Sequence, residues 1–354
     1  MAYTTIDDPS AYFQTTTYTG NGSADKSVTN SGNSDLQPDW VWIKNRDATD
    51  VSCLFDSVRG VTKLLTTVGD VLETTDGDTL DAFQSDGFRV DADVKVNTNN
   101  EKYVAWQWKA GTAVSGNTTG SGTAKTYSGS VNTDSGFSVI KYVANGTAGH
   151  TIPHHLGVVP QMVIAKSISE NRGWPIFHNQ LDDNGYSVFL SANSAQADGT
   201  DSWNSTTPSS TVVTLNNNEN NNKDDDSYIM YSFAEKKGYS KIGYYEGNAN
   251  VDGPYIHLGF SPAYLMVKPI DAADNWVVFD NKRDSFGNGL LSPFSNHPNK
   301  NFAETTDTLQ CSFLSNGVKV KNSGNTINRN SSFIYMAFAH QPFVSSKGTP
   351  ATAV

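Results

Sequence analysis

The chain has 354 residues, which is long enough for two or three domains. Only 17% of the residues are charged and 37% are hydrophobic, and Asn, Thr, Ser and Gly fill the difference, which favours short strands and turns over helices. The formal net charge of -11 argues against a nucleic-acid partner, because a phosphate backbone calls for a basic surface. No apolar run is long enough for membrane insertion, and residues 1–9 do not resemble a secretory signal, so we expect synthesis in a cytoplasm.

A repeated segment is the strongest signal along the chain. Pro38, Pro160 and Pro262 each open an alternating apolar run that ends in a Lys six positions after the Pro, and a Phe follows seventeen positions after the Pro. Such a run predicts a strand, and Pro is tolerated at its start because the missing N–H falls before the ladder begins. We expect three equivalent strands, with the three Phe side chains buried in three separate cores. The repeated residues are Lys44, Lys166 and Lys268, and Phe55, Phe177 and Phe279.

Each repeat closes with an aromatic-rich strand at 103–108, 228–233 or 333–338. These strands are apolar at nearly every position, which predicts a central strand covered on both faces. Segments 85–87 and 315–317 read Ser-Asp-Gly and Ser-Asn-Gly, which is typical of tight hairpin turns. The predicted fold is all-β, with three tandem β-sandwich (jelly-roll-like) domains.

The repeat also sets the expected domain boundaries. We expect the first sandwich at 1–111, a flexible Gly/Ser/Thr linker at 112–126, the second sandwich at 127–237, and the third with a short tail at 238–354. No comparable linker separates the second and third sandwiches, so these two are expected to dock rigidly while the first can move. Residues 57–67 are a short helical candidate.

The histidines do not predict a metal site. His150, His154 and His155 lie close together, and His178 follows in the same repeat. Zinc ligands must converge on one side, whereas adjacent residues of a strand point to opposite sides. We therefore favour histidines that pack within the fold over a zinc site.

Acidic clusters and possible nucleophiles give no catalytic signature either. The clusters at 76–78, 91–93 and 224–226 lack the full spacing of a calcium loop and are typical of turns, although a Ca²⁺ site in these loops is left open. No nucleophile elbow occurs, and nothing singles out a pair of carboxylates. Cys53 and Cys311 make no disulfide framework. We expect no catalytic residue, no metal site and no cofactor.

Trp203 is the candidate binding residue, together with its neighbours Asp201 and Asn204. It lies in a long insert at 191–227 and has no apolar neighbour in the sequence. An isolated Trp on a loop can stack on the face of a sugar. The alternative is that this indole folds back onto its own domain, because large apolar side chains usually find cover.

A resemblance to a known family rests on six segments. They are 38–46 (PDWVWIKNR), 55–60 (FDSVRG), 83–88 (FQSDGF), 103–111 (YVAWQWKAG), 155–160 (HLGVVP) and 343–353 (FVSSKGTPATA). These segments resemble a domain that is common in tail-fibre-like and other virion proteins of tailed phages, many of them marine. The motifs are structural, so the resemblance carries over no catalytic residue.

The resemblance implies a virion protein on the particle surface, assembled in the host cytoplasm. The partners it implies are other virion proteins of the tail or capsid, copies of the same chain in a homotrimer, and a host cell-surface glycan or receptor. No coiled-coil heptads occur, so a short spike or a distal module is favoured over a long fibre. Two alternatives stay open: a capsid decoration or adaptor protein without receptor binding, and a glycan-degrading tailspike enzyme, which would need two carboxylates in a cleft.

Overall fold

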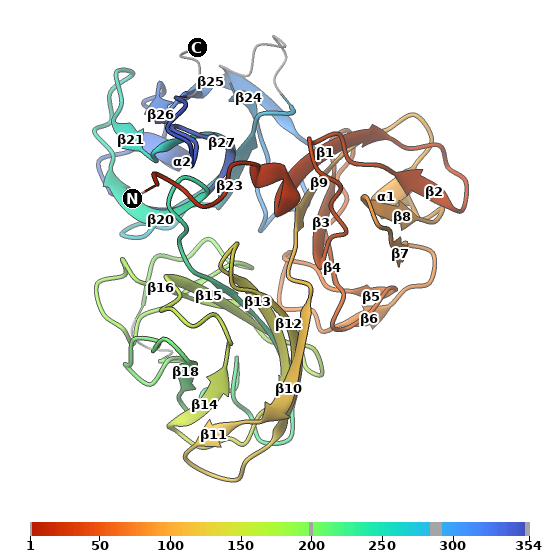
Figure 1. The fold of residues 1–354 in the computed structure, drawn as a ribbon, viewed down its shortest axis with the longest axis vertical. Coiled ribbons are helices and arrows are strands. Elements are labelled where there is room, and N and C mark those ends of the chain that lie inside the picture. The colour runs from red at the N-terminus through yellow and green to blue at the C-terminus, as the bar shows by residue number, and fades with distance from the viewer. Residues whose placement is uncertain (1, 198–200, 284–291, 351–354) are drawn as a thin grey trace.

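The computed structural model describes residues 2–197, 201–283 and 292–350. The fold is all-β, as the sequence predicted, and Figure 1 shows the strands gathered in three lobes. Within the described ranges the helical segments are only three or four residues long: η1 (Pro9–Ala11), α1 (Val94–Asn97) and α2 (Asn325–Asn328). None of the helices in this part of the chain is long and apolar enough to cross a membrane.

The first lobe is a β-sandwich. A four-stranded sheet in the order β1-β9-β3-β4 packs against a three-stranded sheet in the order β2-β8-β7, and a short β5-β6 pair lies beside β4. Its strands are β1 (Phe13–Thr19), β2 (Lys26–Val28), β3 (Trp40–Asn45), β4 (Cys53–Asp56), β5 (Lys63–Leu64), β6 (Thr74–Thr75), β7 (Leu80–Phe83), β8 (Phe88–Val90) and β9 (Lys102–Trp108).

The second lobe has a larger main sheet. Seven strands follow the order β10-β12-β13-β19-β15-β16-β17, and they pack against a three-stranded sheet in the order β11-β14-β18. Its strands are β10 (Thr112–Asn117), β11 (Thr119–Gly120), β12 (Thr126–Asn132), β13 (Phe137–Val143), β14 (His150–Pro153), β15 (Met162–Ser167), β16 (Pro175–His178), β17 (Val188–Phe189), β18 (Val212–Leu215) and β19 (Ser227–Phe233).

The third lobe pairs two four-stranded sheets. Their orders are β20-β27-β22-β23 and β21-β26-β25-β24. The strands are β20 (Ser240–Glu246), β21 (Tyr255–His257), β22 (Phe260–Pro269), β23 (Val277–Asp280), β24 (Ser292–Ser295), β25 (Thr305–Leu314), β26 (Gly317–Val320) and β27 (Ser332–Pro342).

The aromatic closing strands lie in the middle of the main sheets, as predicted. β9 lies between β1 and β3, β19 between β13 and β15, and β27 between β20 and β22. One face of each main sheet covers the sandwich core of its own lobe, and Phe55, Phe177 and Phe279 are buried in three separate cores of this kind. This arrangement explains one apolar face of each closing strand.

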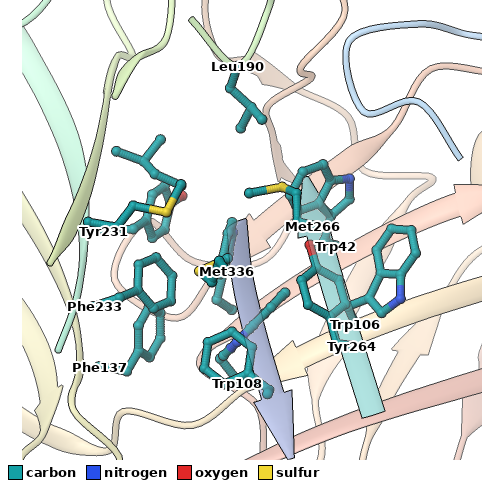
Figure 2. Close-up of a cluster of buried hydrophobic side chains, with 14 of the residues drawn as sticks. Trp42, Trp106, Trp108, Phe137, Leu190, Tyr231, Phe233, Tyr264, Met266 and Met336 are labelled. Atoms are coloured by element: carbon teal, nitrogen blue, oxygen red, sulfur yellow. The ribbon is translucent and has the colours of Figure 1, made fainter. Parts of the chain in front are cut away.

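The other face of each main sheet packs against the main sheets of the other two lobes. We call this shared cluster the junction core, and Figure 2 shows side chains from all three lobes converging in it. The residues are fully or almost fully buried, so apolar surface is removed from water on both faces of every closing strand. Its large members include Trp40, Trp42, Trp106 and Trp108 from the first lobe, Phe137, Tyr231 and Phe233 from the second, and Tyr264, Met266, Met336 and Phe338 from the third.

Polar contacts connect the lobes in a cyclic order. Asp56 ends β4 of the first lobe and accepts a hydrogen bond from Tyr231 Oη of the second at 2.8 Å. His178 ends β16 of the second lobe, and its Nε2 lies 3.4 Å from the carbonyl oxygen of Tyr335 in the third. Asp280 ends β23 of the third lobe and accepts from Trp106 Nε1 of the first at 3.0 Å. In each lobe, therefore, the last residue of the equivalent strand (β4, β16 or β23) contacts the central strand of another lobe.

The predicted hairpin glycines are required by close packing. Gly87, between β7 and β8, has a φ of +95°, and a Cβ atom there would lie 2.0 Å from the carbonyl oxygen of Val28. Gly317 does not adopt a positive φ, but a Cβ atom there would lie 2.2 Å from the carbonyl oxygen of Ile256. A larger residue at either position would force the neighbouring strand away.

The prediction of a flexible linker at 112–126 is wrong. Residues 112–117 form β10 and pair with β12, and residues 119–120 form β11 and pair with β14. The small polar side chains of this segment suit an exposed edge strand, and its backbone hydrogen bonds are made within the second lobe. The first lobe is also not free to move as expected, because it supplies four Trp side chains to the junction core.

Two further expectations need correction. The helical candidate at 57–67 forms turns followed by β5, and the successive residues Leu64 and Leu65 are buried in two different cores, as side chains on opposite sides of an extended segment are. Pro38 and Pro160 lie just before β3 and β15, but Pro262 lies inside β22. The pairing of β22 with β27 shifts register on both sides of Pro262, which is where a strand tolerates a residue without an N–H.

Candidate functional site

Trp203 is buried, so it is not a platform for a sugar. Its side chain is 0% exposed and belongs to the core of the second lobe, where it meets the ring of Phe177 edge-on at 6.2 Å. The indole Nε1 donates a hydrogen bond to Ser187 Oγ at 3.0 Å. The alternative weighed above, a loop Trp that folds onto its own domain, is therefore correct.

Asp201 organises the loop that carries Trp203. Its Oδ1 accepts hydrogen bonds from the backbone N–H groups of Trp203 and Ser205, at 3.1 and 3.0 Å, and its Oδ2 accepts from Asn216 Nδ2 at 2.9 Å. Asn204 adopts a φ of +54°, which Asn tolerates better than most residues. The insert at 191–227 includes residues 198–200, which lie outside the described residues.

A polar hollow lies beside this loop, on the surface of the second lobe. We call it the Asn hollow; it is lined by Arg172, Asp201 and the run from Asn216 to Asn220. The hollow combines side-chain amides with two carboxylates and one guanidinium, which together can donate and accept hydrogen bonds. Of the residues predicted to bind a ligand, Asp201 lies in this hollow, whereas Trp203 does not line it.

Internal contacts hold part of the Asn hollow in place. Asn218 Oδ1 accepts hydrogen bonds from the backbone N and the Nδ2 of Asn220, at 2.9 and 3.0 Å. Asn220 Oδ1 in turn accepts from the N–H of Gly173 at 3.2 Å. Arg172 pairs with the exposed Glu219 at 2.5 Å. The lining is therefore a fixed set of polar groups, and Asn217 and Glu219 are its exposed members.

Three of the four histidines, His150, His154 and His178, are buried, whereas His155 is exposed and its Nε2 lies 2.9 Å from Tyr127 Oη. His150 is buried between Asn222 Oδ1 and Thr118 Oγ1, at 3.1 and 2.7 Å. His154 contacts the carbonyl oxygen of Ser209, and burial lowers the pKa of both imidazoles. Among the described residues, no group of three or more His, Cys, Asp or Glu side chains could hold a metal ion.

Lysines neutralise the acidic clusters. Lys95 Nζ lies 3.2 Å from Asp76 and 2.7 Å from Asp93, which brings two of the clusters together. Lys125 Nζ lies 3.3 Å from Asp224 and 2.5 Å from Asp225. Asp76, Asp93, Asp224 and Asp225 are ion-pair partners, and in the described part of the chain no three acidic side chains converge as a metal site would need.

The repeated lysines at the ends of the strands are buried and structural. Lys44 and Lys166 each donate to the backbone carbonyl oxygen six residues later, at 2.7 Å, and Lys268 donates to that of Pro269 at 2.7 Å. Burial lowers the pKa of each of the three ammonium groups to about 8. Lys44 and Lys166 therefore close equivalent loops, whereas Lys268 bonds to the residue that follows it.

Both cysteines are free and buried, in different lobes. Cys53 lies in the core of the first lobe and Cys311 in that of the third. Burial raises the pKa of both thiols, so neither is a ready nucleophile.

A second cleft lies between β1 and β27, and no sequence pattern indicated it. It is lined by residues from the first and third lobes, including Thr15, Asn281, Lys282 and His340. These residues lie far apart in the chain, and no motif connects them. Only the packing of the first lobe on the third brings them together.

The fold and these surfaces define an all-β protein of three sandwiches around a shared core, with its polar groups on loops and at the contacts between lobes. Residues 8–342 match the DUF7483 family, which is described as a domain of unknown function. Because the match spans nearly the whole chain, the chain belongs to this family. No curated protein and no solved structure matches it.

Proposed function

We propose that this chain is a surface protein of a tailed-phage virion, tail-fibre-like or spike-like, that binds a glycan or another receptor on the host cell without chemistry of its own. The single observation that carries the binding role is the Asn hollow. Amide, carboxylate and guanidinium groups converge there on loops held by a rigid sandwich, and such groups bond well to sugar hydroxyls. The proposal for the virion rests on the family resemblance of the six segments.

The proposed protein assembles in the host cytoplasm, contacts other virion proteins of the tail or capsid, and forms a homotrimer. One weak glycan site per chain holds a cell poorly, whereas linked copies gain avidity. The second candidate is a capsid decoration or adaptor protein without a receptor. The burial of Trp203 favours this candidate, because it leaves the 201–206 loop without an aromatic platform.

Cell binding by purified protein tests the proposal. The labelled chain is incubated with host cells, and the bound fraction of the unaltered chain is compared with that of an Asn217→Ala/Glu219→Gln variant. Asn217 and Glu219 are both exposed, and a partly exposed ion pair such as Arg172–Glu219 contributes little to stability, so the variant should fold. We expect it to lose roughly tenfold in affinity, the loss of one or two good hydrogen bonds.

The matched control is Asn99→Ala, at an exposed Asn of the first lobe far from the hollow in the chain. It should bind cells as the unaltered chain does. Binding that is equal for all three proteins would remove the Asn hollow as the receptor site. A chain that does not bind host cells at all, yet copurifies with the particle, would favour the decoration or adaptor role.

A further inference from the structure

The cleft between β1 and β27 has the features of a ligand site separate from the Asn hollow. It lies where the first and third lobes meet, is partly open to solvent, and has a cavity volume of about 100 Å³. This volume is smaller than that of a site that encloses a whole ligand, so the cleft can cover only part of a small molecule, but contacts between domains are a common place for such sites. We call it the β1–β27 cleft.

The electrostatic character of this cleft is opposite to that of the chain. The chain carries 36 Asp and Glu against 25 Lys and Arg, yet among the described residues no carboxylate lines the β1–β27 cleft. Lys282 and His340 line it instead, and both are exposed. Lys282 forms no ion pair with any residue of the described ranges, so its ammonium group is available to an anion.

The side chains of Lys282 and His340 lie close enough to influence each other. Burial lowers the pKa of His340, and the charge of Lys282 lowers it further. At neutral pH the imidazole is therefore neutral, so it can donate one hydrogen bond and accept another. One fixed positive charge beside a neutral imidazole suits a ligand with one carboxylate and several hydroxyl groups.

Two other lining residues have oxygen atoms without partners. Thr15 Oγ1 and Asn281 Oδ1 are buried and form no hydrogen bond within the described part of the chain. A buried polar atom without a partner is unfavourable. Neither oxygen is accessible to solvent as the side chains lie, so a ligand hydroxyl group donates to it only after the side chain turns towards the cleft.

The remaining lining is apolar. Phe13, Ala263 and Ala339 contribute to it, and all three are buried. Sugar rings have an apolar face of C–H groups as well as polar edges, so a cleft with an apolar part and polar groups fits them better than it fits a bare inorganic ion.

The corresponding contact between the first and second lobes offers an internal comparison. Asn281 and Lys282 follow Pro262 by nineteen and twenty positions, and Ser57 and Val58 follow Pro38 by the same numbers. Ser57 and Val58 also line a cleft, together with residues of β10 and β12. Val58 stands where Lys282 stands, so the cleft at the first contact lacks the cation. The positive charge at the β1–β27 cleft is thus not a requirement of this kind of contact.

We propose that the β1–β27 cleft binds a sugar that carries a carboxylate, such as a hexuronic acid residue of a glycan. Lys282 pairs with the carboxylate, His340 and Asn281 bond to ring hydroxyls, and the apolar residues cover the C–H face. This site is independent of the Asn hollow, whose two carboxylates disfavour an acidic ligand.

Titration calorimetry with three probes tests the assignment on the full chain. The probes are galacturonate, its methyl ester, and acetate. Galacturonate should bind, the ester should bind at least about tenfold more weakly because its charge is removed, and acetate should show no measurable binding because it lacks the ring. Equal binding of acetate and galacturonate would overturn the sugar assignment and leave only a carboxylate site. Equal binding of the ester would overturn the role of charge.

Two variants locate the site. Lys282→Ala should weaken galacturonate binding by about tenfold or more, whereas Lys321→Ala, at another exposed lysine of the third lobe, should leave it unchanged. Thermal unfolding of both variants checks that they fold. Should Lys282→Ala fail this check, Lys282→Gln replaces it, because Gln keeps much of the length of the side chain without its charge. Unchanged binding in the folded variant would overturn the proposal.

These measurements use soluble sugars and no cells, so their outcome is separate from that of the receptor proposal. Binding of galacturonate that depends on Lys282, in a chain that does not adsorb to cells, would support the site and contradict the receptor role. Cell binding that depends on the Asn hollow, without any binding of galacturonate, would support the receptor role and overturn this inference.

Discussion

Trp40→Ala tests whether the junction core makes the three lobes one cooperative structure. Trp40 begins β3 and is 0% exposed. Its ring lies 4.5 Å from that of Trp108 in its own lobe and 4.5 Å, in a stacked arrangement, from that of Tyr231 in the second lobe. Removing this ring empties the place where the first lobe meets the second.

The size of the effect follows from two opposing contributions. Truncating a large buried aromatic side chain costs about 3–5 kcal/mol of unfolding free energy, including the ring contacts. The indole Nε1 of Trp40 is buried and has no hydrogen-bond partner within the described residues, so its removal recovers about 1 kcal/mol or more. We therefore expect a loss near the lower end, about 3 kcal/mol.

Urea unfolding followed by circular dichroism, together with calorimetry, measures this loss. Phe279→Ala is the matched control, because Phe279 is equally buried but lies in the core of the third lobe alone. The control should cost about 3–5 kcal/mol and keep the number of transitions of the unaltered chain. Trp40→Ala should instead make the first lobe unfold separately. A loss below about 1 kcal/mol, or an unchanged number of transitions, would refute the role assigned to the junction core.

Three further predictions concern the contacts between lobes and the former linker. Burial lowers the pKa of His178 to about 4 from 6.5, so as the pH falls the unfolded chain binds this proton before the folded chain does. The free energy of unfolding should therefore fall between pH 6.5 and pH 4, and the loss should reach about 2 kcal/mol at pH 5. His178→Asn should remove this part of the pH dependence, as measured by urea unfolding at pH 7 and 5. Tyr231→Phe should cost about 1–3 kcal/mol in the same assay, because Asp56 loses a buried donor. A protease of broad specificity should not cut 112–126 first, since this segment is paired in sheets, and mass spectrometry of the early fragments checks this.

The repeat allowed much of the fold to be predicted from the sequence. An alternating run gives a strand with one buried face, and the closing strands, apolar at nearly every position, indicated that both faces are covered. The pattern does not say what covers the second face. Trp106, Tyr231 and Met336 occupy matching positions of their strands, and all three meet in the junction core, which only the assembled structure makes visible.

The errors have a common physical cause, because composition describes neighbours along the chain and not neighbours in space. Residues 112–126 have the composition of a flexible linker, but their backbone groups find partners in β12 and β14. Trp203 is surrounded by polar residues in the sequence, yet Phe177, twenty-six positions earlier, lies next to its ring. Asp201 is a better candidate for a ligand-binding residue than Trp203, since a carboxylate in a polar loop stays near the surface whether or not the loop folds back.

The cyclic contacts between lobes bear on the proposed homotrimer. A trimer of single sandwiches would need two different surfaces on each sandwich that fit one another head to tail around a threefold axis. Here the face of each main sheet that points away from its own sandwich core already contacts the other two main sheets within a single chain. The contacts run through the junction core and through the strand ends at Asp56, His178 and Asp280. These faces are not available for contact between chains, so a homotrimer would have to use edges and loops. The three lobes are also not three equal sites, because the Asn hollow belongs to the second lobe and the β1–β27 cleft to the contact of the first with the third. Avidity for a glycan therefore still requires several chains, even though each chain has three sandwiches.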